Sequence, residues 1–164
     1  MDMLSRRKVE ICCVQEVRYR GAGTVSIGSN QDKYKLWWSG NNNRQSGVGL
    51  MIQEAMVENV IEIERTNDRI MKAKLVLGKE IVHIFSVYAP QSGRPHEEKI
   101  EFWEKLSYAV SQVPINEGLI VGGDLNGHVG MNRDGFEEVI GIYSLGERNQ
   151  EGELVLEFCQ NHNL

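Results

Sequence analysis

The chain has 164 residues, of which 41% are hydrophobic and 25% charged, and its formal net charge is −5. This length and hydrophobic content suit one globular domain with a buried core. The negative charge gives no overall attraction to nucleic acid, so a polyanion would have to be held by local basic residues or through a bound cation. The sequence contains no run of about 18 apolar residues, the length needed to span a membrane. The first 14 residues lack the apolar stretch and cleavage site of a signal peptide, which predicts an intracellular protein, nuclear or cytoplasmic.

The three cysteines, Cys12, Cys13 and Cys159, are predicted to be reduced and buried. Two of them are adjacent in an apolar run, and the third lies in a helical pattern. Their spacing matches no zinc motif and does not suggest a disulfide framework.

Short apolar runs predict several strands in the first half of the chain. The predicted strands are residues 8–14, 34–38, 48–52, 57–63, 70–77 and 80–88. Residues 53–60 alone could also form a helix. The Gly- and Ser-rich segment 21–32 and the polar segment 39–47 are predicted loops. Gly78 and Lys79 suit a tight hairpin turn, so the strands on either side of them should be antiparallel neighbours.

Two segments have helical periodicity. In residues 95–113, apolar side chains recur every three or four positions, Pro95 suits the first helical position, and Glu97 and Glu98 suit the first turn. Residues 151–162 predict a second amphipathic helix. Many strands with two widely separated helices indicate an α+β layered sandwich rather than a regularly alternating parallel fold.

The segment from Gly118 to Gly130 carries the strongest chemical signal. It predicts an apolar strand that runs into glycines and presents Asp124 and Asn126 two residues apart. In an extended backbone these side chains would point to the same face, as a carboxylate–carboxamide pair. Taken alone, residues 124–127 would more often be a turn than an active site. A calcium loop is excluded because Val129 stands where the loop needs glycine, and the twelfth position, Gly135, is not a Glu.

Polar residues also stand at the ends of other predicted strands, namely Gln15 with Glu16, Arg69 and Tyr88. If these ends gather at one edge of a sandwich, they would form an acidic pocket for a hard divalent cation, of which Mg²⁺ is the natural candidate. Such a metal can polarise a phosphoryl oxygen, as phosphodiester hydrolysis requires. Taken singly, Glu16 could be a solvated residue, and Tyr88 a core ring whose hydroxyl reaches water.

Five short motifs occur in an order and spacing that resemble one known superfamily. They are Gln15-Glu16, Gly47-Val48-Gly49-Leu50, Val87-Tyr88-Ala89-Pro90, Gly123-Asp124-Leu125-Asn126 and Gly146-Glu147-Arg148-Asn149. Over nearly the whole chain they resemble the endonuclease/exonuclease/phosphatase superfamily, and within it the endonuclease domains of non-LTR retrotransposons and the related craniofacial-development-protein-2-like proteins. The resemblance implies an α+β fold, a partial four-layer α/β/β/α sandwich with two mixed, largely antiparallel sheets.

The same resemblance implies a magnesium-dependent endonuclease, with Mn²⁺ as an alternative metal, and DNA as its substrate. Glu16 would be the metal-ligating carboxylate. Tyr88 would bind and orient the target phosphate, while Asp124 and Asn126 would position the attacking water and stabilise the transition state.

Loop arginines are candidates for contacts with substrate phosphates. Arg18 and Arg94, together with Arg20 and Arg44, lie in loops near the edge of the expected pocket. As surface arginines, their default role is solubility. The sequence predicts no membrane or protein partner, and it leaves the oligomeric state open.

The resemblance also implies that residues 1–164 form a single incomplete domain, without the family's first strand and its C-terminal strands. Members of the family carry an Asn close to the metal on that first strand and a terminal Asp-His pair. Neither His128 nor His162 stands in that context. Because loss of a general acid or base typically costs about 10² to 10⁴ in rate, weak activity is expected. The alternatives are a non-catalytic remnant that binds metal or nucleic acid weakly, and a phosphatase of inositol phosphates or a lipid phosphodiesterase with the same core site.

Overall fold

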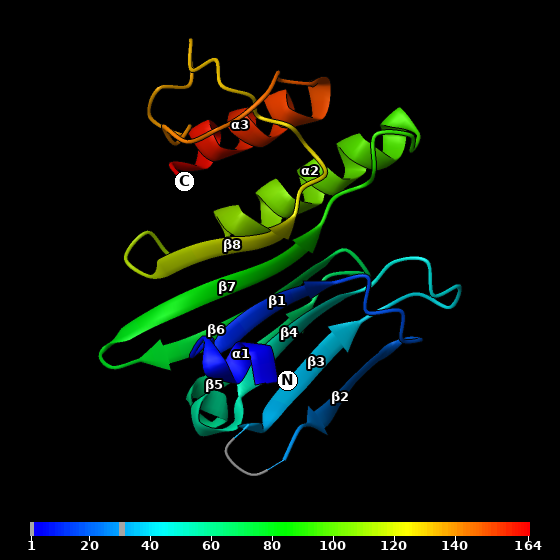
Figure 1. Ribbon diagram of the computed structural model, residues 1–164, viewed down its shortest axis with the longest axis vertical. Coiled ribbons are helices and arrows are strands. Elements are labelled where there is room, and N and C mark those ends of the chain that lie inside the picture. Colours follow the sequence, from blue (N-terminus) through cyan, green and yellow to red (C-terminus); the bar gives the residue numbers. More distant parts are fainter. Residues whose placement is uncertain (1, 30–31) are drawn as a thin grey trace. The chain divides into compact units, whose positions relative to one another are not determined.

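The computed structural model describes residues 2–29 and 32–164. Its elements in chain order are α1 (Asp2–Arg6), β1 (Ile11–Gln15), β2 (Ala22–Ile27), β3 (Tyr34–Ser39), β4 (Val48–Gln53), the 3₁₀ helix η2 (Glu54–Asn59), β5 (Val60–Arg65), β6 (Ile70–Leu77), β7 (Glu80–Tyr88), α2 (His96–Ser111), β8 (Gly118–Asp124) and α3 (Gln150–His162) (Figure 1). These elements confirm the α+β class.

The chain divides into two compact units. Unit 1 comprises Met1–Tyr88 and Pro114–Asp124, and unit 2 comprises Ala89–Val113 and Leu125–Leu164. All eight strands belong to unit 1, and the two long helices belong to unit 2.

Unit 1 contains two four-stranded sheets. The first has the strand order β1-β4-β3-β2, and every pairing between its described strands is antiparallel. The second has the order β5-β6-β7-β8, in which β8 runs parallel to β7 and the other pairs are antiparallel. The expectation of largely antiparallel sheets is confirmed, and the second sheet is mixed.

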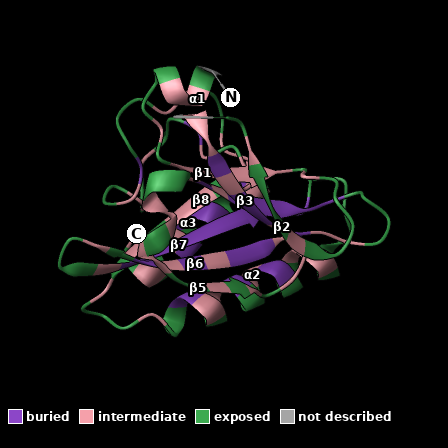
Figure 2. Cartoon of the chain, turned by 90° about the horizontal axis from the view of Figure 1, so that it is seen from below, coloured by how far each residue is buried: buried purple, intermediate pink, exposed green. Residues whose placement is uncertain are grey.

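The core of unit 1 lies between the two sheets. Buried residues of β4, such as Leu50 and Ile52, join one hydrophobic cluster with Met71 and Leu75 of β6. Figure 2 shows buried residues concentrated along the strands and exposed residues in the connecting loops. On β6, buried and less buried residues largely alternate, as expected for a strand with one face on a core. On β7, every residue from Val82 to Tyr88 is buried.

Two expectations for the strands were wrong. Residues 22–27, within the predicted loop 21–32, form the edge strand β2, because their backbone pairs with β3 from Ala22↔Ser39 to Ile27↔Tyr34. This tertiary pairing overrides the loop-like composition. Positions 30 and 31 of that predicted loop lie outside the described residues. The strand predicted at 57–63 begins only at Val60, after the short helix η2.

Unit 2 is held together by its two long helices. Trp103 of α2 lies 5.3 Å from Phe158 of α3 between ring centroids, and Phe102, on the same helix as Trp103, is buried. Both helices coincide closely with the predicted ones. Across residues 2–29 and 32–164, no helix combines the length and the apolar character needed to cross a membrane.

Candidate active site

The two sheets of unit 1 meet at Glu16 and Tyr88. Glu16 directly follows β1, and Tyr88 ends β7. The Tyr88 hydroxyl donates a hydrogen bond of 3.0 Å to Oε1 of Glu16. One residue earlier on β1, Gln15 donates through Nε2 to Oγ of Ser86 at 3.4 Å. The structure therefore brings together two of the residues that the sequence analysis assigned to the site.

The Glu16 carboxylate is also paired with an arginine. Arg18 donates through Nη2 to Oε2 of Glu16 at 2.7 Å, and their side chains are 70% and 44% exposed. The hydrogen bond from Arg18, followed by the one from Tyr88, lowers the pKa of Glu16 below its ordinary value. The carboxylate is therefore ionised at neutral pH and accessible to solvent, as a ligand for a hard cation must be.

The backbone at this segment has an unusual conformation. Glu16 and Arg18 both have left-handed φ angles, 53° and 56°. Residues other than glycine, asparagine and aspartate rarely adopt such φ angles. Residues with strained backbones of this kind cluster at functional sites. The Val17 amide between them donates to the Gly47 carbonyl at 3.3 Å, which anchors the turn.

Arg69 holds Tyr88 in place. The Tyr88 amide donates to the Arg69 carbonyl at 2.9 Å, and Nη1 of Arg69 donates to the Tyr88 carbonyl at 3.2 Å. The Arg69 guanidinium also lies 5.4 Å from the centre of the Tyr88 ring. Arg69 thus belongs to the same strand-end cluster, as expected, and it fixes both the backbone and the ring of Tyr88.

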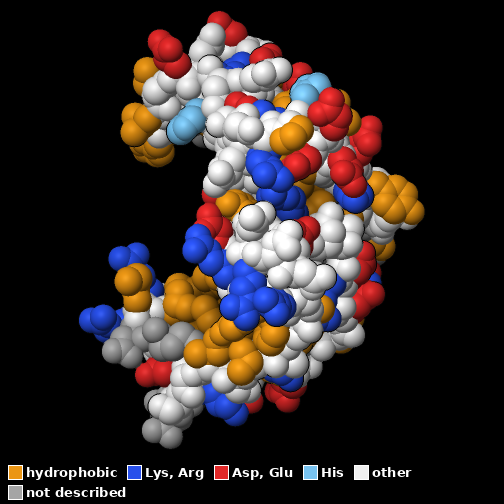
Figure 3. Space-filling model, turned by 90° about the vertical axis from the view of Figure 1, so that its right-hand side faces the viewer, with side chains coloured by type: hydrophobic (Ala, Val, Ile, Leu, Met, Phe, Trp, Pro, Cys, Tyr) orange, Lys and Arg blue, Asp and Glu red, His pale blue; other side chains and the backbone are white. Residues whose placement is uncertain are grey.

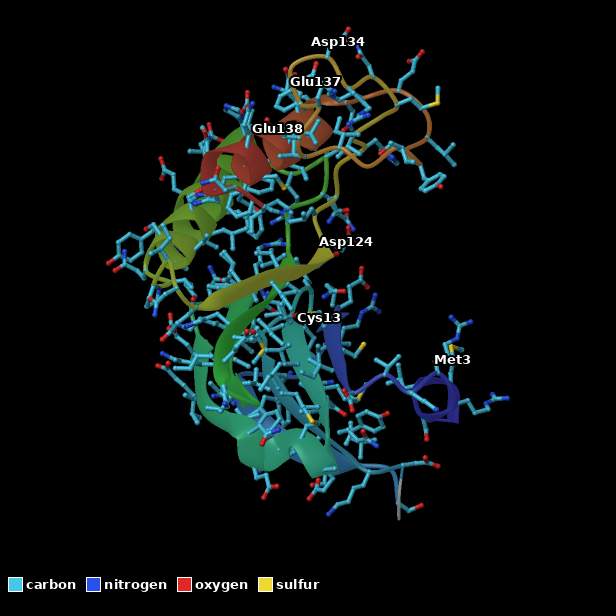
Figure 4. The ribbon with its side chains drawn as sticks, turned by 90° about the vertical axis from the view of Figure 1, so that its left-hand side faces the viewer. Met3, Cys13, Asp124, Asp134, Glu137 and Glu138 are labelled. Atoms are coloured by element: carbon cyan, nitrogen blue, oxygen red, sulfur yellow. The ribbon has the colours of Figure 1, made fainter. Side chains whose placement is uncertain are left out.

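Asp124 is the neighbour of Tyr88 across the parallel strand pair. β8 ends at Asp124, and its register partner on β7 is Tyr88. Figure 4 shows Asp124 at the end of β8. The preceding Gly123 has a φ of +148°, and a Cβ atom there would lie 2.0 Å from the Val87 carbonyl oxygen. Only glycine fits at this position, so the close contact between β8 and the backbone of β7 just before Asp124 depends on it.

Asn126 lies beyond the strand, in unit 2. Its φ is +49°, and its Nδ2 donates to the Ala89 carbonyl at 2.8 Å. The expectation that Asp124 and Asn126 share a face assumed a strand that continues past Asp124, whereas β8 ends at Asp124. The side chain of Asn126 instead ties the segment after β8 to the segment after β7.

Arg94, also in unit 2, lies just before α2 and pairs with an acidic residue of that helix. Its Nε and Nη2 donate to the two carboxylate oxygens of Glu98 at 2.9 and 2.8 Å. This bond raises the pKa of Arg94. The guanidinium is 49% exposed, so a contact with a phosphate would have to compete with Glu98.

The sequence analysis missed a partly buried polar cluster beside this site. Asp68 accepts through Oδ2 from Ser46 Oγ and, at 3.0 Å, from Asn41 Nδ2. Ser46 is 2% exposed. The cluster fixes the loop between β3 and β4 against the residue preceding Arg69. The available signal was Ser46, a polar residue directly before Gly47-Val48-Gly49 at the start of β4. Nothing in the sequence indicates that Ser46 contacts Asp68.

In unit 2, the helix-capping residue Asn149 links the motif that ends at Asn149 to the segment that follows Asn126. Asn149 Oδ1 accepts from the Gly152 amide at 2.8 Å, as the N-cap of α3, and from the His128 amide at 2.9 Å. A Cβ on Gly152 would lie 1.9 Å from the His128 carbonyl oxygen. The motif around Asn149 therefore has a structural role: it joins the start of α3 to the segment that follows Asn126.

The donor set suits a cation that needs few protein ligands. Within the described part of the chain, no group of three or more His, Cys, Asp or Glu side chains could hold a metal ion. Mg²⁺ commonly binds through one or two carboxylates and keeps several waters, and the exposed, ionised Glu16 fits that pattern. The three cysteines are free, as predicted, but they are half-buried rather than buried. Burial raises the pKa of Cys13 to about 11.

The fold is an α+β sandwich of two packed sheets with a carboxylate–phenol cluster at the strand ends. The chain belongs to the Endonuclease/Exonuclease/phosphatase family, whose sequence profile matches residues 1–133.

Two curated relatives carry the name Craniofacial development protein 2. The protein from Bos taurus is 25% identical over 162 residues, which cover 98% of this chain and 26% of the relative. The protein from Tragulus javanicus is 24% identical, with 98% and 27% covered. The chain therefore spans about a quarter of the length of these relatives.

Two solved structures share the fold. The AP endonuclease LMAP from Leishmania major aligns with a TM-score of 0.62 at 13% identity, over 99% of this chain and 60% of that chain. The endonuclease domain of TRAS1, a telomere-specific non-LTR retrotransposon, aligns with a TM-score of 0.57 at 13% identity, over 97% and 62%.

Proposed function

We propose that the Glu16–Tyr88–Asp124 cluster is the catalytic centre of a magnesium-dependent phosphodiester hydrolase, by descent a DNA-nicking endonuclease of a retrotransposon. The observation that carries this proposal is the hydrogen bond from the Tyr88 hydroxyl to the ionised Glu16, beside the register partner Asp124. Membership of the family and the two endonuclease neighbours support it.

Each residue has a role that follows from its chemistry. Glu16 would hold Mg²⁺, or Mn²⁺ in its place, and the bound cation would supply Lewis-acid polarisation of a phosphoryl oxygen. Tyr88, which Arg69 fixes in position, would donate its hydroxyl hydrogen to a phosphate oxygen and so orient the phosphodiester. Asp124 would orient the attacking water and accept its proton, and Asn126 would donate an amide hydrogen to the developing charge.

Arg18 is the proposed phosphate contact of unit 1. It is 70% exposed and, among the described residues, pairs with Glu16. If a cation held the Glu16 carboxylate, Arg18 would be able to pair with a substrate phosphate, for which its planar guanidinium is suited. In unit 2, Arg94 is the second proposed phosphate contact, with Glu98 as its competitor.

We also propose that residues 1–164 form one incomplete domain and that their activity on their own is low. The chain covers 60% and 62% of the two solved neighbours. No described histidine of unit 1 is available as a general acid or base, because His83 is buried and bound to Glu117. A non-catalytic remnant that binds metal or nucleic acid weakly is the competing outcome.

Plasmid nicking tests the proposal. Supercoiled DNA incubated with the chain is expected to be nicked slowly in Mg²⁺ and not in EDTA. Asp124→Ala should lower the rate by about 10² or more, whereas Asp134→Ala, which removes an exposed loop carboxylate, should leave it unchanged.

The second part of the experiment is the same assay on a chain extended at both ends by its flanking coding sequence. The nicking rate of the extended chain should be higher than that of residues 1–164. Nicking by Asp124→Ala at the wild-type rate contradicts the assignment of the site. Absence of nicking from both the short and the extended chain contradicts the enzymatic function and leaves the remnant.

A further inference from the structure

A surface of three arginines and one tyrosine lies next to Glu16 in unit 1. Arg18, Tyr19 and Arg20 follow Glu16 in the chain after one intervening residue, Val17, and all three are exposed, with Tyr19 at 47%. Arg44, also exposed, belongs to the loop between β3 and β4. Figure 3 shows Lys and Arg side chains lying against a hydrophobic area on one face of the molecule. Arg18, Arg20 and Arg44 add three exposed positive charges to two segments of the acidic chain.

The segment that carries Tyr19 is fixed before any ligand binds. The Gly40 amide donates to the Gly21 carbonyl at 2.7 Å, and a Cβ on Gly40 would lie 2.1 Å from the Tyr19 carbonyl oxygen. Together with the bond from Val17 to Gly47, these contacts press the segment onto the loop that contains Arg44. A surface that is already ordered loses little conformational entropy on binding.

The Tyr19 ring packs against Trp38 and stays partly exposed. It lies 4.8 Å from the Trp38 ring between centroids, at an interplanar angle of 45°. Trp38 is itself fixed, because its carbonyl accepts from Arg65 Nε at 3.0 Å and because its ring lies over Gly23, where a Cβ would come within 2.4 Å. The remaining surface of the Tyr19 ring is open to solvent. An aromatic ring that packs against a fixed neighbour on one side and is exposed elsewhere is suited to stack on a flat ligand.

The cations around this ring favour a nucleic-acid strand as the ligand. Neither Arg20 nor Arg44 has an ion-pair partner among the described residues. Guanidinium groups pair with backbone phosphates, and aromatic rings stack on unpaired bases without regard to sequence. An acidic protein surface would use the arginines, but it would gain nothing particular from an exposed ring between them.

We propose that Arg18, Tyr19, Arg20 and Arg44 bind an unpaired segment of nucleic acid, with one base stacked on Tyr19 and backbone phosphates on the arginines. This proposal rests on the proposed function, because it places the strand beside the cleavage centre at Glu16. It adds a substrate feature to that function: the bound strand exposes at least one base.

Binding without hydrolysis tests the proposal. Fluorescence anisotropy in EDTA measures the affinity of the chain for a short labelled oligothymidylate and for a blunt duplex. Tyr19→Ala should weaken oligothymidylate binding by about tenfold, Tyr19→Phe should bind like wild type, and Tyr108→Ala, which removes a 70% exposed tyrosine of α2, should also bind like wild type. Duplex binding should not depend on Tyr19. Replacing Arg20 or Arg44 by Gln should reduce the slope of log affinity against log salt by about 0.7 each.

Three results would overturn the proposal. The first is an unchanged oligothymidylate affinity in Tyr19→Ala, and the second is a loss of affinity in Tyr19→Phe equal to that in Tyr19→Ala. The third is that polyglutamate displaces the oligothymidylate equally well from wild type and from Tyr19→Ala. Thermal melting of each variant shows whether a loss comes from unfolding. Because this assay needs neither metal nor catalysis, its outcome is independent of plasmid nicking: nicking without a Tyr19 dependence contradicts this surface alone, and a Tyr19 dependence without nicking contradicts the proposed function alone.

Discussion

Two carboxylates mark the opposite ends of the β7–β8 strand pair, and their surroundings differ. At one end, Glu117 precedes β8, accepts from Lys74 Nζ at 3.1 Å and pairs with Nε2 of the buried His83. Its side chain is 13% exposed. At the other end, Glu16 is 44% exposed and is held by a solvated arginine and one phenol. Glu117 is enclosed by its partners, whereas Glu16 is open to a ligand.

The comparison shows that a lowered pKa does not by itself identify a functional carboxylate. The pKa of Glu117 is lowered, first by its bond to His83, and that of Glu16 is lowered, first by its bond to Arg18. What distinguishes them is access and backbone: Glu16 has a left-handed φ and an exposed partner. Structural ion networks also shift pKa values, so geometry has to decide between the two.

Two glycines of β8 should respond very differently to alanine. Gly123→Ala, at the Glu16 end, places a Cβ 2.0 Å from a backbone oxygen at a φ of +148° and should lower the free energy of unfolding by about 3 kcal/mol or more. Gly118→Ala, at the Glu117 end, places a Cβ 3.2 Å from the Val82 side chain and 3.6 Å from the Ile81 carbonyl oxygen, and it should change the free energy of unfolding by about 1 kcal/mol or less. Urea unfolding of the two variants measures the difference. Equal effects would show that the close approach before Asp124 is not required.

Neutralising the two carboxylates should separate stability from function. Glu117→Gln leaves Lys74 and the buried His83 without their anion, so its Tm should fall by roughly 5 °C. Glu16→Gln alters an exposed pair, so its Tm should stay within about 2 °C of wild type. Calorimetry at neutral pH measures both. A larger loss in Glu16→Gln than in Glu117→Gln would reverse the roles of the two ends.

The pH dependence of the same variants provides the control. The pKa of Glu117 in the folded chain is below its ordinary value of 4.5, so as the pH falls the unfolded chain takes up a proton first. The stabilisation from ionised Glu117 is therefore complete above the ordinary value and is lost as the pH falls through the lowered pKa. The gap in Tm between wild type and Glu117→Gln should close over that range. A gap that persists at lower pH would point to a packing defect instead.

Much of the fold could be predicted because local pattern and tertiary structure agree. β6 and β7 have the predicted bounds, since their apolar runs flank a two-residue turn with Gly78 at a φ of +66°. β2 could not be predicted, because its composition is that of a loop and only its pairing with β3 makes it a strand.

The candidate site was predictable only in part. Resemblance placed Glu16 with Tyr88, and the structure joins them by a hydrogen bond. That Asp124 and Asn126 share a face stays a prediction; β8 ends at Asp124, and no sequence rule fixes the residue at which a strand ends. Asp68 was missed because its partners lie more than twenty positions away in the chain, and long-range hydrogen bonds leave no local pattern.

Titration with Mn²⁺, followed by NMR line broadening of the backbone amides, tests most directly that the Glu16 end is the metal-binding end of this strand pair. His83 and Tyr88 are five residues apart on β7, about 17 Å, so the two ends are distinguishable by their distance from a paramagnetic ion. The amide signals of Glu16, Tyr88 and Asp124 should broaden first, and those of His83 and Glu117 should remain sharp. Broadening that begins at His83 and Glu117, or that is uniform over the chain, would contradict the account.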